Sequence, residues 1–461
     1  MIKLVDLLVI LLIIFSGICS ASFIQKDENK QNYDLIIIST MDFVEELQPL
    51  KNHKENFGIL TKIITLDDIY NGTYFEVQGR DNPEKIKYFI KEAKESWNTR
   101  YVFLVGGKEK IPIRLSRIYI ITGDYSYYIS DLYYADLFYA NGSFCSWDSN
   151  NDGIFADKNK SGYVDQVDLI PDVYIGRVLC NNELEVCNVV EKIITYETSS
   201  YNQPWFENLV VCGGDDARRT LLEIFFPFLL NKIGRVVFEG EYLGDRAEDI
   251  LKNFKTKKVY ASGFFRPMIK SLTTDNINEA INGGAGFLMF NGHGKTDSAI
   301  ITNFPFCRNV WLPKPLGYKS SDIQNLKNGF KLPVAIFGGC FCGDFNTTPN
   351  PIAWEFIKHS DGGSIASFAC TSGAQLLLSS LITDSLHGYL EMDIFKLFSE
   401  GKDIIGDIWA KSIEDYLNDD NAMKLSDDFS MLNWNHTLSN HFVIEEWALF
   451  GDPSLKIGGY E

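Results

Sequence analysis

Residues 286–294 read Gly286-Phe287-Leu288-Met289-Phe290-Asn291-Gly292-His293-Gly294, an apolar run that leads directly into a glycine-flanked histidine. The arrangement recurs where the apolar run Val334–Phe337 precedes Gly338-Gly339-Cys340-Phe341-Cys342-Gly343-Asp344. Buried parallel strands read as such runs, and the C-terminal edge of a parallel sheet is where α/β folds collect reactive groups. The two stretches therefore predict an α/β fold that carries a histidine and a cysteine at one sheet edge.

Apolar runs and helical periodicities alternate along the rest of the chain, which predicts a helix-covered, mainly parallel sheet. The expected strands are 34–39, 59–65, 101–105, 173–176, 209–212, 235–238, 286–290, 334–337 and 364–368. The expected helices are 43–56, 82–97, 182–196, 217–230, 351–358 and three shorter ones near Ile277, Leu390 and Ile408. This order consists of two α/β units in sequence.

The length of the chain and a cluster of turn-forming residues near its middle predict two subdomains. A chain of 461 residues is too long for one ordinary core. Asn202-Gln203-Pro204 is the best candidate linker because it combines turn-forming residues between two series of elements. We therefore expect an N-terminal subdomain at 30–203 and a catalytic subdomain at 204–461.

Composition excludes several classes of protein. A hydrophobic content of 45% and an aromatic content of 14% exclude a disordered chain. A net charge of -18 argues against nucleic acid or an anionic membrane surface as the main partner. The nine cysteines show no disulfide framework, and Cys187 and Cys370 lie in apolar stretches typical of core residues.

The first residues predict export. Lys3 precedes the mostly apolar stretch 7–19, and the small residues Ser20, Ala21 and Ser22 follow it. This is the layout of a signal peptide, which we place at 1–22. An uncleaved N-terminal anchor is the alternative, and no second run reaches membrane length. The expected location is therefore secreted or on the extracellular surface.

The two glycine-flanked loops carry residues for acyl transfer. Cys340 is the candidate nucleophile, and His293 is the candidate base that polarises the thiol and protonates the leaving amine. The backbone amides of Gly294 and Cys340 are the candidate oxyanion hole. A single histidine after a strand is more often an ordinary loop residue, and a single cysteine at a strand end is more often packed in the core. The occurrence of both at glycine-flanked strand ends favours catalysis. Zinc binding by Cys340, Cys342 and His293 is a weaker alternative, because one residue separates the two cysteines, whereas two residues usually separate paired zinc ligands.

These stretches resemble the gingipain-type cysteine peptidases of the caspase-like clan. The resemblance covers the chain from about residue 33 to residue 457 and rests on five segments. They are Pro171–Arg177, Ile194–Glu197, Phe290–Gly294, Gly339–Phe345 and Phe450–Leu455.

The resemblance implies a caspase-like three-layer α/β/α fold with mainly parallel sheets and two tandem subdomains. It also implies the roles given above to Cys340, His293 and Gly294. The family places an acidic residue near the catalytic histidine, and here Asp215 or Asp216 is the candidate. The same pair has two further interpretations, a pocket carboxylate that selects arginine or lysine and a helix N-cap. The segment 370–375 resembles the family's pocket wall but lacks an aromatic side chain.

A polar, aromatic-rich insert at 145–168 contains an expected calcium loop. From Asp148 onward, oxygen ligands stand at alternate positions with glycine at the sixth place, as in the first half of an EF-hand loop. Asn159 occupies the position of the closing Glu, so Asp157, Asp165 or Asp168 must close the shell. The expected ligands are Asp148, Asn150, Asp152, Ile154 and Asp157. A polar turn without an ion is the alternative.

The sequence thus predicts a secreted or surface cysteine endopeptidase that acts through a thioester acyl-enzyme. We expect protein or peptide substrates and no nucleic-acid partner. We also expect a monomer with structural calcium, no organic cofactor and no membrane insertion beyond the possible N-terminal anchor. Two alternatives remain open, a caspase-fold surface protein that binds or adheres without turnover and a transpeptidase that uses the same Cys-His dyad.

Overall fold

The structure is a computed structural model that describes residues 32–120, 123–159, 162–214, 238–264, 266, 268–302, 316–377, 379–433 and 439–461. Its centre is an eleven-stranded sheet in the order β11-β10-β9-β12-β16-β17-β18-β8-β3-β1-β2. The N-terminal part of the chain supplies β1 (Leu35–Ser39), β2 (Thr61–Thr65), β3 (Tyr101–Val105) and β8 (Tyr174–Val178). The later strands are β9 (Asn208–Gly213), β10 (Lys255–Tyr260), β11 (Lys270–Ser271), β12 (Phe287–Asn291), β16 (Val334–Phe337), β17 (Ala366–Cys370) and β18 (Trp447–Phe450).

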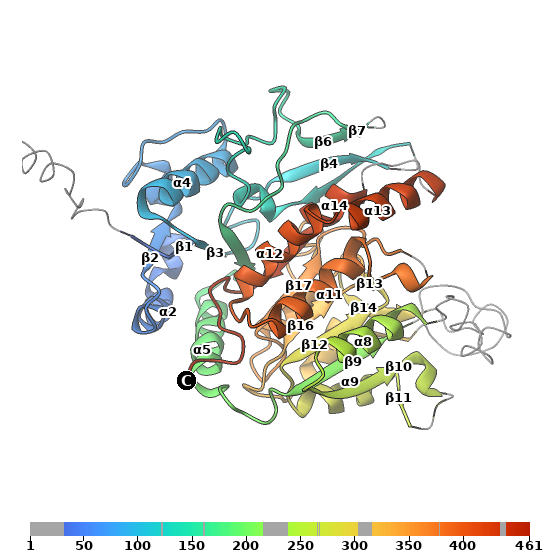
Figure 1. The fold of residues 1–461 in the computed structure, drawn as a ribbon. Helices are drawn as coiled ribbons and strands as arrows, with labels where there is room; N and C mark the ends of the chain where they lie inside the picture. Colours follow the sequence, from blue (N-terminus) through green and yellow to red (C-terminus); the bar gives the residue numbers. More distant parts are fainter. Residues whose placement is uncertain are drawn as a thin grey trace, which may run out of the picture.

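Helices cover both faces of the sheet, since every residue of central strands such as β12, β16 and β17 is buried. One set of packed helices is α2 (Val44–Asn56), α5 (Glu183–Ser199) and α10 (Ile352–Lys358). Another set, drawn in front of the sheet in Figure 1, is α8 (Glu239–Ile250), α11 (Leu386–Ser399) and α12 (Ile405–Leu417). The remaining helices are α3 (Leu66–Tyr70), α4 (Asn82–Trp97), α9 (Thr274–Asn282), α13 (Asp420–Asn433) and α14 (Ser439–Glu445). The architecture is the predicted α/β fold.

Strand β18 joins the two halves of the sheet. It pairs antiparallel with β17 and parallel with β8, whereas every other pair in the sheet is parallel. The strands of the N-terminal half therefore run opposite to β12 and β16. As a consequence, the C-terminal ends of β1, β3 and β8 lie at the edge away from His293 and Cys340.

A buried ion network fixes this junction. Lys54 Nζ of α2 lies 2.8 Å from carboxylate oxygens of both Glu197 and Asp452, and all three side chains are fully or almost fully buried. Burial alone would lower the pKa of Lys54, but Asp452 and Glu197 raise it above its usual value. A Cβ on Gly176 would lie 2.3 Å from the carbonyl oxygen of Gly451, so glycine is needed for the close approach of β8. The 450–455 segment thus connects the two halves.

Two small sheets were not expected from the sequence. One consists of β4 (Leu115–Tyr119) and β5 (Tyr125–Ile129), together with β6 (Phe155–Asn159) and β7 (Gly162–Tyr163) from the insert. The residues after β12 form β13 (His293–Lys295), β14 (Ser298–Thr302) and β15 (Leu316–Lys319). His293 therefore begins a short strand, where the sequence suggested a loop.

Several further expectations can be compared with the structure. Cys187 is exposed on α5, which corrects its assignment to the core, whereas Cys370 is buried as expected. The cysteines of the described residues are all free thiols. The signal peptide, the helix at 217–230 and residues 235–237 lie outside the described residues. No helix within the described ranges has the length and hydropathy needed to cross a bilayer. No helix or strand lies between α5 and β9, where the subdomain boundary remains a prediction.

Candidate active site

The two glycine-flanked loops are in backbone contact. A Cβ built on Gly294 would lie 2.5 Å from the carbonyl oxygen of Cys340 and 2.7 Å from the carbonyl carbon of Gly339. A Cβ on Gly339 would in turn lie 2.9 Å from the nitrogen and the Cα of Gly294. Any side chain at either position would separate the loops. The pairing of β12 with β16 produces this contact, because their C-terminal ends are adjacent.

The predicted nucleophile and base face one cavity of about 140 Å³. Exposed His293 and partly exposed Cys340 line it together with buried Glu239. The other lining residues are Gly292, Gly338, Ala374, Leu376, Leu377 and Ile382. The structure therefore brings together the two residues that the sequence places 47 positions apart, and it adds a carboxylate and a mostly apolar wall.

The turn that presents Cys340 is strained and tied down. Phe341 follows with φ 59°, a left-handed conformation that costs a non-glycine residue roughly 1–2 kcal/mol. Its N–H donates to the carbonyl oxygen of Ser372 at 2.6 Å, which fixes the turn against the neighbouring loop. The Cys340 Sγ lies 3.6 Å from the carbonyl oxygen of Ala374. The ring of Phe341 remains 41% exposed beside the cavity.

Cys342 is chemically different from Cys340. It is completely buried, and burial together with the nearby Cys340 raises the pKa of its thiol well above the usual value. A buried thiol of this kind is a poor nucleophile. Among the residues that the structure describes, the one group with converging metal-ligand atoms contains Cys370, so the zinc alternative built on Cys340, Cys342 and His293 finds no support.

Glu239 is the acidic residue that sequence reasoning missed. It begins α8, and this end of the helix packs on the ends of β9 and β12, since a Cβ on Gly240 would lie 2.6 Å from the carbonyl oxygen of Asn291. Glu239 directly follows the predicted strand 235–238, just as His293 and Cys340 follow theirs, and that position was the available signal. Asp215 and Asp216, the predicted acidic candidates, lie outside the described residues.

The wall of the cavity is the segment after β17. The hydroxyl of Thr371 donates to the carbonyl oxygen of Ile129 at 2.6 Å, and its backbone N–H donates to the carbonyl oxygen of Glu446 at 3.0 Å. Strand β5 and the residue before β18 therefore hold the start of the wall in place. Leu376 and Leu377 supply the apolar surface, and the wall has no aromatic ring between Cys370 and Gln375, as the sequence indicated.

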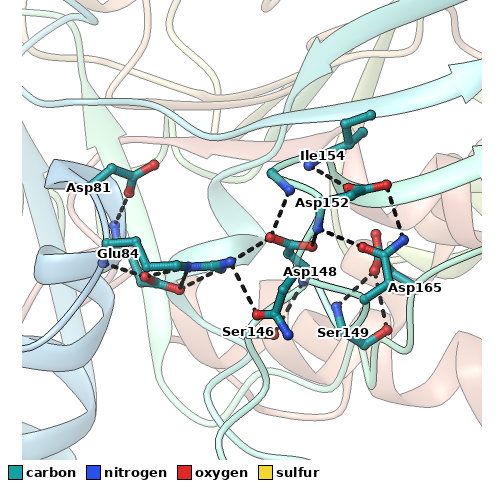
Figure 2. Close-up of polar contacts among 12 residues, drawn as sticks. Asp81, Glu84, Ser146, Asp148, Ser149, Asp152, Ile154 and Asp165 are labelled. Atoms are coloured by element: carbon teal, nitrogen blue, oxygen red, sulfur yellow. Dashed lines mark hydrogen bonds and ion pairs between the residues drawn. The ribbon is translucent and has the colours of Figure 1, made fainter.

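The expected calcium loop is a tight turn anchored to α4 (Figure 2). The carboxylate of Asp148 accepts N–H bonds from Asp152 at 3.0 Å and Gly153 at 3.1 Å. Arg80 Nη1 also lies 2.6 Å from Asp148 Oδ2 and brings a positive charge to the loop. The Asn150 amide nitrogen donates to Asp152 Oδ2 at 3.1 Å, so the two predicted ligands point toward each other.

Of the carboxylates expected to close the loop, Asp165 lies against it, whereas Asp157 is paired with an arginine. Both oxygens of Asp157 accept from Arg117, at 2.6 and 2.7 Å. Asp165 lies against the loop and accepts from the backbone and the hydroxyl of Ser149 (Figure 2). Burial raises the pKa of Asp165, although hydrogen bonds from Asp157 and Ser149 act in the opposite direction. Ile154, whose N–H donates to Asp152, remains in place to offer its carbonyl oxygen.

A mainly parallel α/β sheet of caspase-like architecture thus carries a cysteine and a histidine at adjacent strand ends, in one cavity, which is the arrangement that a cysteine peptidase requires. The model of peptidase family C25 matches residues 28–458, which is nearly the whole chain. The chain therefore belongs to peptidase family C25. This confirms the resemblance to the gingipains.

The individual relatives are distant. Gingipain R2 and gingipain R1 of Porphyromonas gingivalis are each 19% identical over 438 residues, or 93% of this chain. The chain spans only 46% and 34% of their lengths. The crystal structure of the Arg specific cysteine proteinase gingipain R shares the fold, with a TM-score of 0.59 at 16% identity over 93% of this chain and 79% of that one. The complex of the Porphyromonas gingivalis RgpB pro- and mature domains gives the same TM-score and identity over 92% and 79%.

Proposed function

We propose that this chain hydrolyses peptide bonds with Cys340 as nucleophile and His293 as general acid and base. The observation that carries the proposal is the contact between the two glycine-flanked loops, which places both side chains on one cavity. Membership of family C25 supports the same reaction class. A binding protein without turnover would have no need for an accessible thiol and imidazole on one cavity.

The proposed reaction has two halves. The Cys340 sulfur attacks the peptide carbonyl carbon as its proton passes to His293, and the oxyanion accepts hydrogen bonds from the amides of Gly294 and Cys340. The carbon–nitrogen bond then breaks, the amine leaves with the proton from His293, and a thioester remains. A water molecule gives its proton to His293 and attacks the thioester, and the acid and the thiol are released.

We propose further that Glu239 favours substrates with arginine or lysine before the scissile bond. A buried carboxylate in a small pocket binds a cationic side chain favourably. The mostly apolar wall of the pocket would contact the methylene groups of a long basic side chain. The related structure of the Arg specific cysteine proteinase gingipain R supports this preference. Asp215 and Asp216 remain candidates for the residue that orients His293.

The test of the dyad is selective alkylation. We expect iodoacetamide at neutral pH to modify Cys340 far faster than buried Cys342, and His293→Ala to abolish this preference. Lys295→Ala, an exposed change on the same short strand, is the control and should keep it. Equal reactivity of Cys340 and Cys342 in the folded wild-type protein would contradict the proposal.

The test of specificity uses fluorogenic peptides that differ in the residue before the scissile bond. We expect Glu239→Gln to lower kcat/KM for arginine and lysine peptides by about 10²-fold, the usual cost of removing one partner of a buried charge pair. Neutral peptides should be affected much less. A uniform loss for all peptides would assign Glu239 to support of His293 instead.

We also propose that the chain is exported, acts as a monomer on proteins or peptides, and binds calcium at the insert. Asp148, Asn150, Asp152, the Ile154 carbonyl and Asp165 are the proposed ligands, which are the oxygen donors that calcium requires. Intact mass of the exported protein would show whether residues 1–22 are removed, and light scattering would give its oligomeric state.

A further inference from the structure

Three metal-ligand side chains converge behind the cavity wall. Cys370 ends β17, His387 lies in the first turn of α11 and Glu446 directly precedes β18. All three are fully buried, and one ligand atom from each lies within 4.8 Å of the others. Antiparallel pairing of β17 with β18 brings the first and last together, since Cys370 pairs with Trp447.

The polar atoms of this cluster lack ordinary hydrogen bonds. Within the described part of the chain, neither His387 Nε2 nor either carboxylate oxygen of Glu446 has a partner in hydrogen-bond geometry. His387 Nε2 lies 3.3 Å from Glu446 Oε1. Leaving such groups buried without hydrogen-bond partners is energetically costly. A cation at the centre of the cluster would remove that cost.

The opposite side of the imidazole is held by the cavity wall. His387 Nδ1 lies 3.0 Å from the carbonyl oxygen and 2.8 Å from the backbone nitrogen of Gln375. The backbone N–H of Gln375 donates to Nδ1 here, which leaves the ring proton on Nε2, facing Glu446. Zinc binding would move that proton to Nδ1, where the Gln375 carbonyl accepts it, and would turn the Nε2 lone pair toward Cys370 and Glu446, the usual arrangement of a metal-bound histidine. A proton on Nε2 instead gives a plain His–Glu hydrogen bond. The tautomer protonated on Nδ1 can bind a metal ion, whereas the tautomer protonated on Nε2 cannot.

We propose that Cys370, His387 and Glu446 bind one zinc ion. Sulfur, imidazole and carboxylate ligands together suit zinc, whereas calcium and magnesium prefer oxygen alone. The second oxygen of Glu446 offers a fourth donor atom.

The site would have a structural effect on the wall of the cavity. The zinc-bound His387 would hold Gln375, and the adjacent Ala374 carbonyl is the group that lies 3.6 Å from the Cys340 sulfur. The wall segment would thereby be fastened to β17 and β18, the two strands at the junction of the sheet. This inference is independent of catalysis, because metal content can be measured in an inactive protein.

The experiment uses the full chain with Cys340→Ala, which removes the proposed nucleophile and prevents autolysis. Elemental analysis after dialysis should find about one zinc per chain, and X-ray absorption at the zinc edge should find one sulfur ligand. Cys370→Ser should lose the zinc. The control Cys212→Ser, which changes a buried cysteine on β9 outside the cluster, should retain it.

The outcomes are decisive even if Cys370→Ser does not fold, because metal content and the sulfur ligand are measured on the parent protein. Less than about one tenth of a zinc per folded chain, with none taken up from added zinc chloride, would overturn the proposal. Bound zinc without a sulfur ligand would also overturn it. Either result would assign the cluster to the tautomer in which His387 donates to Glu446.

Discussion

Replacing Gly294 by alanine tests the contact between the catalytic loops most directly. The added Cβ would lie 2.5 Å from the Cys340 carbonyl oxygen, whereas ordinary contact begins at about 3.4 Å. The loops must therefore separate by about 0.9 Å, against backbone atoms that have no other rotamer. A displacement near 1 Å typically costs about 10²-fold in rate, and overpacking costs about 1–3 kcal/mol of stability. We expect kcat/KM to fall by at least about 10²-fold while the protein stays folded.

The assay combines steady-state hydrolysis of a fluorogenic peptide with thermal unfolding of the same sample. Gly373→Ala is the matched control, because a Cβ there meets no atom within 4 Å although the residue belongs to the neighbouring wall segment. It should behave as wild type in both measurements. Wild-type activity in Gly294→Ala would refute the reasoning, as would an activity loss that merely follows the fraction unfolded.

Three further changes test the energetics of the fold. Lys54→Met leaves Glu197 and Asp452 buried without their cation and should lower the free energy of unfolding by about 3–5 kcal/mol in urea titrations, whereas Lys51→Met, which breaks an exposed pair, should cost less than about 1 kcal/mol. Burial raises the pKa of Glu241 to about 7, so its contribution to stability is complete below pH 4.5 and is lost as the pH rises through 7. Urea titrations of both proteins across this pH range should show that Glu241→Gln removes up to about 3 kcal/mol of that pH dependence. The same pH dependence in both proteins would contradict the prediction, because it would mean that Glu241 titrates normally. Calcium at 100 times its Kd should stabilise the wild type by about 2.7 kcal/mol and raise its Tm, and this gain should vanish in Asp148→Asn and persist in Asp157→Asn.

The parallel strands could be predicted because burial on both faces leaves a strong pattern. The prediction for β3 and β16 matches their observed bounds, and those for β1 and α2 differ by one residue at one end. The Asn82-Pro83 signal correctly located the start of α4, although its N-cap is Asp81. In each case a local rule of hydrophobic period or capping agrees with the tertiary structure.

The antiparallel strand β18 and the clustering of Glu239, Glu446 and Thr371 around the cavity could not be predicted in the same way. The apolar run 447–450 is short, and nothing local to it indicates that it pairs between β17 and β8. Glu446 meets Cys370 and His387 only because of that pairing. Residue types alone could nominate Cys340 and His293, but the remaining members of the site depend on contacts between segments far apart in the sequence.

The position of β18 also bears on how the polypeptide reaches its native state during synthesis. Strands β8 and β17 each leave the ribosome well before the strand that pairs with both, so each must wait with one open edge. Open edges of this kind attract foreign strands, and contacts between distant segments form slowly. A synthetic peptide with the sequence of β18 would compete for the gap between them, which suggests a route to blocking maturation before a catalytic cavity ever forms.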